Sequence, residues 1–335
     1  MSRTETRYEK WRNFRMRNKQ SEGYLLRKKG FDATYRLIRA VLLFGMCFLI
    51  LQPLANKISI SFMAEKDLYD ATVISIPRNF TTENYKLVSE LIGFWKALFN
   101  TIWVALLVSV VQIIFCTLIG YGFARFKFPL KKFWFACVIL VIVVPPQTIM
   151  SSLYLHFRFF DVFGISQLLT GKTINLQNSI IPYIMLCMGG MGLKSGLYVF
   201  MIRQYFRGVP KELEEAAYID GCGNLSTFIR IMLPDAKPIL TSCFLFAFVW
   251  QWTDSFYSKL FLGNMKLLPK MLTSISGLLD DYMIAINGVG SKASIAYGQM
   301  MISTGMIMAI IPLLILYVIV QRGFVESLSQ SGIKM

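Results

Sequence analysis

The sequence has few charged residues and almost no histidine. Only 16% of its 335 residues are Asp, Glu, Lys or Arg, and His156 is the one histidine. A water-soluble domain carries about 25% charged residues, so a soluble fold could not cover this much apolar surface. A metal site built from several histidines is excluded by the single His156.

Paired cysteines and a nucleotide-binding loop are also missing. The six cysteines show no paired spacing, and most lie in apolar runs, where cysteine packs as a small hydrophobic residue. Segment 189–195 resembles a phosphate-binding loop, but Leu193 stands where the glycine before the lysine is required. Paired acids and an activated nucleophile are absent as well. We therefore expect no enzymatic activity, no metal and no cofactor in this chain.

Long apolar runs dominate the sequence instead. Hydrophobic residues make up 55% of the chain, and the mean hydropathy is +0.52. A helix needs about 20 apolar residues to cross a bilayer. Runs of sufficient length lie at about 40–63, 97–123, 133–155, 180–202, 239–262 and 300–320. The sequence thus predicts an all-α integral membrane protein with six transmembrane helices, which Pro145-Pro146, Pro182 and Pro312 are expected to kink.

The basic residues predict the orientation of these spans. Segments 1–39, 124–132, 203–238 and 321–335 hold 23 of the 35 Lys and Arg residues. Cytoplasmic segments carry such an excess, so both termini are predicted to be cytoplasmic in a multi-pass protein of the cell membrane. Because the charge lies beside a span, its partner is expected to be anionic membrane lipid and not nucleic acid.

We expect three parts: a basic cytoplasmic N-terminal tail (1–39), a transmembrane domain (40–322) and a cytoplasmic C-terminal tail (323–335). In the first tail, Tyr8, Trp11 and Phe14 recur every three residues, which fits an amphipathic helix at the membrane surface. A disordered tail that only sets the topology is the alternative.

The third cytoplasmic segment has the signals of a helix–turn–helix. Pro210 can occupy the first turn of a helix whose acidic residues follow near its positive end. Gly221 ends this helix. Asn224 or Ser226 can cap a second helix, which Pro234 closes. So much order in a loop indicates more than a passive connection.

The same segment carries a recognisable motif. Glu215-Ala216-Ala217 is followed by Gly221, nine further residues and Ile231-Met232-Leu233-Pro234. This pattern resembles the signature of binding-protein-dependent ABC importer permeases. Segments 80–85, 121–129 and 321–325 look like the corresponding segments of the maltose-type carbohydrate branch.

The resemblance implies a type I ABC importer permease fold with cytoplasmic coupling helices. The coupling segment would be 203–237, and the residues that contact the ATPase would be Glu214, Glu215, Ala216, Ala217, Asp220, Gly221, Ile231, Leu233 and Pro234. ATP and Mg would be bound by two separate ATPase subunits. A second, related permease would complete a heterodimer, and an extracytoplasmic binding protein would deliver a sugar or oligosaccharide. We expect the glycine-rich stretch 263–298 to be a mobile loop that contacts the binding protein.

Two alternatives remain at this point: an ion-coupled secondary transporter, and a permease for a non-sugar solute. A proton-coupled transporter needs ionisable groups inside its helices. Among the 19 acidic residues, only Asp254 is predicted to lie clearly within a span. This scarcity weakens the first alternative.

Four residues in the fifth predicted span are candidates for the substrate path: Trp250, Gln251, Trp252 and Asp254. Aromatic faces stack on sugar rings, and amides and carboxylates bind hydroxyl groups. The alternative is an interfacial belt, since tryptophan favours the headgroup region.

Lys194 is the one cation deep in a predicted span, and no carboxylate shares that span. A charged lysine at such a depth is costly. Three outcomes are open: it faces a water-filled path, it pairs with the partner permease, or the neighbouring glycines break the helix.

Overall fold

The computed structural model describes residues 7–21, 23–161, 164, 167–168 and 171–333. This part of the chain is built from helices, and its only extended pairings are two isolated bridges, Met63–Phe80 and Phe160–Ile174. The chain divides into two compact units, 1–60 and 61–335, and each is described by itself. The predicted all-α class is confirmed.

The first unit contains α1 (Arg7–Gln20) and most of α2 (Tyr24–Ser61). α2 runs through the predicted boundary between tail and span at residues 39–40, so the helix begins inside the basic tail. Pro53 lies within α2 without ending it. α2 is long and apolar enough to cross a membrane.

α1 agrees with the helical alternative for the N-terminal tail. The guanidinium of Arg15 lies 5.2 Å from the centre of the Trp11 ring, one turn away. The side chains of Tyr8 and Phe14, on which the amphipathic prediction also rests, lie outside the described part.

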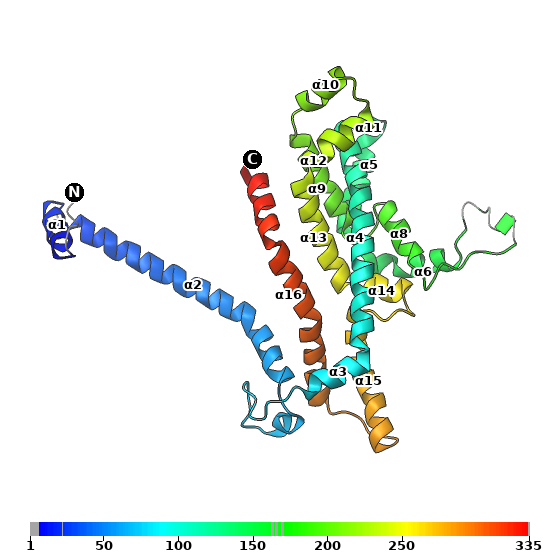
Figure 1. The fold of residues 1–335 in the computed structure, drawn as a ribbon, viewed down its shortest axis with the longest axis horizontal. Helices are drawn as coiled ribbons and strands as arrows, with labels where there is room; N and C mark the ends of the chain where they lie inside the picture. Colours follow the sequence, from blue (N-terminus) through cyan, green and yellow to red (C-terminus); the bar gives the residue numbers. More distant parts are fainter. Residues whose placement is uncertain (1–6, 22, 162–163, 165–166, 169–170, 334–335) are drawn as a thin grey trace. The chain divides into compact units, whose positions relative to one another are not determined.

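The second unit is a bundle around α4 (Phe94–Arg125), which packs against α8 (Ile181–Met188), α9 (Ser195–Gly208) and α13 (Lys237–Thr253) (Figure 1). α16 (Ile295–Ile333) packs against α13, α15 (Leu268–Asn287) and α3 (Glu83–Ile92). The remaining helices of this unit are η1 (Glu65–Tyr69), α5 (Lys131–Val143), η2 (Pro146–Ile149), α6 (Met150–Arg158), α10 (Glu212–Ile219), α11 (Asn224–Thr227), η3 (Phe228–Met232), α12 (Leu233–Asp235) and α14 (Phe256–Phe261).

Three of the six predicted spans are broken. In the described residues, three helices can cross a membrane unaided, or five if each bent pair of helices counts as one span. α5 and the η2–α6 segment meet at 99°, because Pro145-Pro146 removes two successive backbone N–H donors. The predicted kink is thus confirmed, but it is a sharp bend. The predicted span 180–202 is divided into α8 and α9, and 239–262 into α13 and α14.

The prediction of a loop at 263–298 is wrong for most of that stretch. Residues 268–287 form α15, which packs against α16, α3 and α4. Leu268, Ile275 and Leu279 are buried on this helix, at spacings that place them on one face. Gly288 and Gly290 lie in the turn after α15, with φ of 89° and 96°. The abundance of glycine in 263–298 suggested a loop, whereas the residues before Gly288, with their helical spacing of apolar side chains, form a helix.

α5 and α9 approach each other closely at Gly196. A Cβ at this position would lie 2.8 Å from the carbonyl oxygen of Val138 and 2.8 Å from Cγ1 of Ile142. The small residues at 192 and 196 therefore serve packing within this chain.

We predict that Gly196→Ala lowers the stability of the permease by about 1–3 kcal/mol, because α5 must move away from α9. The midpoint of thermal unfolding of the detergent-purified complex measures this. Gly277→Ala is the matched control, since Gly277 lies in α15 with no atom within 4 Å of its added Cβ. An equal or higher midpoint for Gly196→Ala than for Gly277→Ala would refute the packing argument.

Candidate functional site

The predicted helix–turn–helix is present and lies at one end of the bundle (Figure 1). α10 begins at Glu212, just after Pro210. The second helix begins at Asn224, and its N-cap is Gly223, not Asn224 or Ser226 as predicted. Pro234 does not close the second helix, contrary to prediction: the chain stays helical to Asp235 through a π-helical turn, η3, and the three-residue α12. Because the wide π turn shifts the hydrogen-bond pattern, it accommodates the missing N–H of Pro234.

Gly221 forms the turn between α10 and α11. Its φ is +84°, a left-handed conformation that disfavours any residue with a Cβ. Its N–H donates to the carbonyl of Tyr218, and the N–H of Cys222 donates to that of Ala217. These two bonds form a Schellman motif, which satisfies the last carbonyls of α10. The prediction that this helix ends at Gly221 is confirmed.

Glu214 anchors α10 to the end of α4. The hydroxyl of Tyr121 donates to Oε1 of Glu214 at 2.9 Å, and Nε of Arg125 lies 3.3 Å from Oε2. Nη2 of Arg125 also donates to the carbonyl of Val209 at 2.7 Å. The side chains of Arg125 and Glu214 are only 7% and 10% exposed. A buried, hydrogen-bonded ion pair thus fixes α10 to a transmembrane helix.

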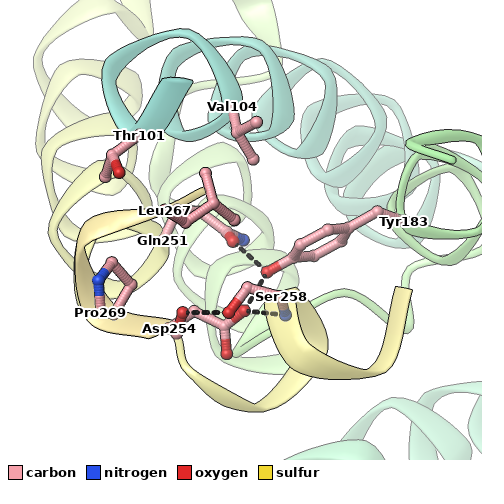
Figure 2. Close-up of a pocket in the computed structure, with 8 residues that line it drawn as sticks. All are labelled: Thr101, Val104, Tyr183, Gln251, Asp254, Ser258, Leu267 and Pro269. Atoms are coloured by element: carbon pink, nitrogen blue, oxygen red, sulfur yellow. Dashed lines mark hydrogen bonds between the residues drawn. The ribbon is translucent and has the colours of Figure 1, made fainter. Parts of the chain in front are cut away.

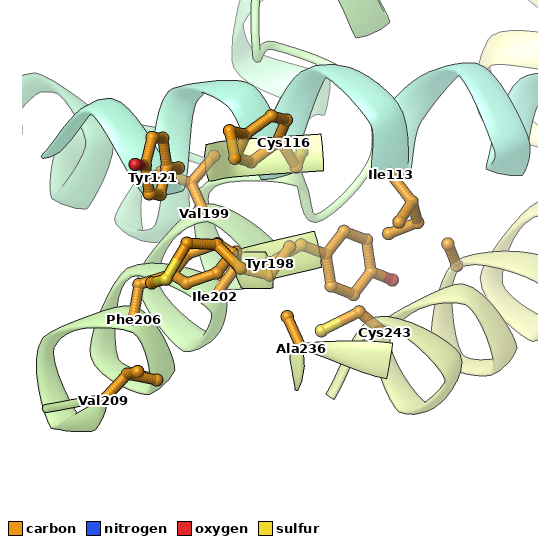
Figure 3. Close-up of a cluster of buried hydrophobic side chains, with 13 residues drawn as sticks. Ile113, Cys116, Tyr121, Tyr198, Val199, Ile202, Phe206, Val209, Ala236 and Cys243 are labelled. Atoms are coloured by element: carbon orange, nitrogen blue, oxygen red, sulfur yellow. The ribbon is translucent and has the colours of Figure 1, made fainter. Parts of the chain in front are cut away.

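Tyr121, which bonds to Glu214, belongs to an apolar cluster beside this ion pair (Figure 3). The ring of Tyr121 packs against Phe206 of α9 and Phe228 of η3, with centroids 5.2 Å and 4.7 Å away. Ile202 is fully buried in the same cluster, beside Gly120 of α4. α10, η3, α9 and α4 therefore share one packed core at this end of the bundle.

The predicted coupling residues divide between this core and the surface. Glu214 and Ala217 are buried. Exposed or partly exposed are Glu215, Ala216, Asp220, Gly221, Ile231, Leu233 and Pro234. Apolar residues that were not predicted are also exposed, among them Ile219 at 87% and Leu225 at 70%. Tyr121 and Arg125 were missed as members of this site, although the motif that contains them was recognised.

The substrate-path candidates lie on different faces of α13. Trp250 lines a cavity of about 550 Å³ between α5, η2, the 191–194 segment and α14, together with Lys194. Trp252 is buried, and its Nε1 donates to the carbonyl of Ala309 in α16 at 3.2 Å. Successive helical residues point about 100° apart, so one face cannot present all four candidates.

Gln251 and Asp254 belong to a buried polar network (Figure 2). The hydroxyl of Tyr183 lies within hydrogen-bond distance of the Gln251 amide oxygen and 2.9 Å from Oδ2 of Asp254. Asp254 was predicted to lie within a span. It lies instead at the C-cap of α13, where the span is broken. There its carboxylate accepts three N–H groups from residues 256–258, in the first turn of α14. Free helix N–H groups need such an acceptor, which explains an acid at this break.

The helix is broken at Lys194, one of the three predicted outcomes. Lys194 has a φ of 62° and is the N-cap of α9. Gln112 of α4 stabilises the break, since its Nε2 donates to the carbonyl of Leu193 at 2.7 Å and to Oγ of Ser195 at 2.8 Å. Nζ of Lys194 lies 4.9 Å from the centre of the Trp250 ring, within the range of a cation–π interaction.

We predict that Glu214→Gln destabilises the complex by on the order of 3 kcal/mol, because it leaves Arg125 buried without its countercharge. The double variant Arg125→Met with Glu214→Leu should recover part of this loss. Thermal unfolding of the detergent-purified complex measures both effects. Glu215→Gln is the control on the exposed face of α10 and should change stability by less than about 0.5 kcal/mol. A loss as large for Glu215→Gln would contradict the role of the ion pair.

Comparison with known proteins agrees with this architecture. The family model described as binding-protein-dependent transport system inner membrane component matches residues 116–329. The chain is 27% identical to the arabinooligosaccharides transport system permease protein AraQ of Halalkalibacterium halodurans, over 86% of this chain and 93% of the relative. It is 26% identical to the maltodextrin transport system permease protein MdxG of Bacillus subtilis, over 86% and 92%.

A solved structure has the same fold. A chain from the crystal structure of a bacterial ABC transporter involved in the import of the acidic polysaccharide alginate superposes with a TM-score of 0.67, covering 87% of this chain and 96% of that one, at 19% identity. The likeness extends the family match beyond residues 116–329 and confirms the predicted permease fold. This chain belongs to the binding-protein-dependent transport system inner membrane components: it is a permease subunit of an ABC importer, not an enzyme.

Proposed function

We propose that this permease imports a sugar or oligosaccharide, and that α10 and α11 couple it to an ATPase subunit. As a family member it works with ATPase and binding-protein partners. The relatives named for arabinooligosaccharides and maltodextrin support carbohydrate as the solute, since each covers most of this chain. The family match displaces the ion-coupled alternative.

One observation supports the coupling role above all: α10 and α11 are firmly attached on one side and unpartnered on the other. Glu214 and Ala217 face the core. Ile219 and Leu225 stand on either side of the Gly221 turn and are 87% and 70% exposed. Exposed apolar side chains grouped in this way indicate a protein-binding surface. We assign that surface to the ATPase.

The attachment supplies a mechanical route into the membrane. The Glu214–Arg125 ion pair connects α10 to α4, and η3 and α12 connect α11 to α13 across a 74° bend. Closure of the ATPase dimer would thus displace α10 and α11 as rigid bodies, together with the ends of α4 and α13 to which they are attached. α13 carries Trp250 to the 550 Å³ cavity. Movement at α10 therefore changes the cavity walls.

This role fixes the expected orientation and partners. ATP is cytoplasmic, so the end of the bundle with α10 and α11 would face the cytoplasm. α16 runs from the α15 end toward that side, which supports a cytoplasmic C-terminus (Figure 1). The basic residues of 1–39 support a cytoplasmic N-terminus as well. The opposite end, with α3 and α15, would face the binding protein, and a second related permease with its own ATPase would complete the importer.

We predict that Gly221→Ala reduces solute-stimulated ATP hydrolysis about tenfold, because the left-handed conformation costs about 1–2 kcal/mol with a Cβ. Gly221→Val should abolish it. Hydrolysis is measured with the complex of permeases, ATPase and binding protein in proteoliposomes. Gly208→Ala is the control, since Gly208 lies in helix α9 with no atom within 4 Å of an added Cβ. Wild-type stimulation in Gly221→Val, at normal complex yield, would remove the coupling assignment.

The orientation gives a separate prediction. In a chain that keeps only Cys222 of its six cysteines, a membrane-impermeant maleimide should react in inside-out vesicles, after the ATPase is stripped, and not in intact cells. Val289, fully exposed in the turn after α15, provides the matched position: in a cysteine-free chain, Val289→Cys should react from outside only. The opposite pattern would invert the proposed topology.

A further inference from the structure

The 550 Å³ cavity has one charged group in its wall. Its lining is mostly aliphatic and comes largely from residues 140–146 and 191–193. Beside Lys194, the polar or aromatic exceptions are Gln147, Trp250, Phe256 and Tyr257. Among the described residues that line it there is no Asp or Glu. Because a cavity of low polarity strengthens electrostatic interactions, this single ammonium determines which charge the cavity accepts.

Lys194 has no carboxylate partner among the described residues: the two ion pairs found there, Arg78–Asp70 and Arg125–Glu214, do not involve it. Asp254, the acid beside Trp250 in sequence, is already satisfied by Tyr183 and by the first turn of α14. The left-handed backbone at Lys194 and the Gln112 hydrogen bonds fix the base of the side chain. The ammonium is thus held at the cavity without a countercharge.

Trp250 lies beside this ammonium. Trp250 is 44% exposed, and Nζ of Lys194 is 4.9 Å from the centre of its ring. An aromatic face of this kind stacks on the C–H groups of a sugar ring. The pair therefore presents a surface for the ring and a positive charge for a substituent on the same ring. Gln147 adds an amide for hydroxyl groups.

We propose that the cavity binds an acidic sugar, with the carboxylate of a uronate unit on Lys194 and its ring against Trp250. This inference rests on the proposed import of carbohydrate and narrows it to uronate-containing oligosaccharides. A carboxylate fits better than a phosphate: one ammonium is a single point charge that matches one negative charge, and the cavity wall offers no arginine fork for a dianion.

The test compares charged and neutral forms of the same oligosaccharides. Oligouronates from pectin and from alginate, each beside its carboxyl-reduced counterpart, are supplied to the complete importer in proteoliposomes, and uptake and ATP hydrolysis are measured. We expect at least one oligouronate to be taken up at least tenfold faster than its reduced form. Lys194→Met should lower that uptake roughly tenfold or more, and Lys194→Arg should retain part of it.

Lys259→Met is the matched control. It removes the same charge from an exposed position on α14 that does not line the cavity, and it should leave uptake unchanged. Uptake of the reduced forms alone, indifferent to Lys194→Met, would overturn the acidic-sugar proposal and leave carbohydrate import standing. Failure of Lys194→Met to copurify with the partner permease would also overturn it, by showing a structural ion pair. If no oligosaccharide, charged or neutral, stimulates the wild type, carbohydrate import itself fails.

Discussion

The coupling role that we propose for α10 depends on the attachment of Glu214 to Tyr121 and Arg125. Without it, α10 would be a short helix on a flexible loop, and force applied to it would not reach the membrane. A buried ion pair contributes little net stability, because the desolvation of both charges offsets their attraction. Its value is geometric: the carboxylate accepts a hydrogen bond from Tyr121 and forms an ion pair with Arg125, both on α4, so it fixes the position of α10 relative to that helix. The ring of Tyr121 packs in turn against Phe206 and Phe228, which ties the buried ion pair to the core.

A second constraint comes from the bilayer. Backbone N–H and C=O groups at membrane depth must be paired, so a broken helix is tolerated only where side chains satisfy it or where it lines a cavity. Both solutions occur here. Gln112 pairs with the backbone at the 189–194 break, and Asp254 accepts the free N–H groups that follow α13. Gln251 joins the two, since its Nε2 donates to Oε1 of Gln112 at 3.2 Å. The breaks are thereby linked through one buried network.

The sequence predicted those parts of the fold that depend on local chemistry. Gly221 ends α10 because its backbone requires a left-handed residue, and that requirement is local. Pro145-Pro146 likewise predicted a bend. The loop at 263–298 was predicted wrongly, since its glycines lie mainly after α15, and the burial of Ile275 depends on the distant helices that cover it.

Which residues make up the coupling site and the cavity was harder to predict from the sequence. Glu214 and Tyr121 are 93 residues apart, and only the packing of α9 and η3 brings them together. Trp250, Gln251 and Asp254 are near neighbours in sequence, and for that reason they were grouped as one patch. Helical geometry separates them: Trp250 faces the cavity, whereas Gln251 and Asp254 face the interior.

α13 connects the coupling segment to the cavity. The helix begins after α12 at the 74° bend, and near its end it carries Trp250 on one face and the Gln251–Asp254 network on another. A rotation of α13 about its axis would move Trp250 past Lys194 and strain the bonds of Gln251 to Gln112 and Tyr183 at the same time. The broken helix at Lys194 and the wall of the cavity would then move together, because Gln112 is bonded to the broken helix and Trp250 is part of the cavity wall. In the mechanism that we propose, a change in the ATPase at α10 would thus reach a solute through hydrogen bonds and packed side chains, without any flexible loop between them.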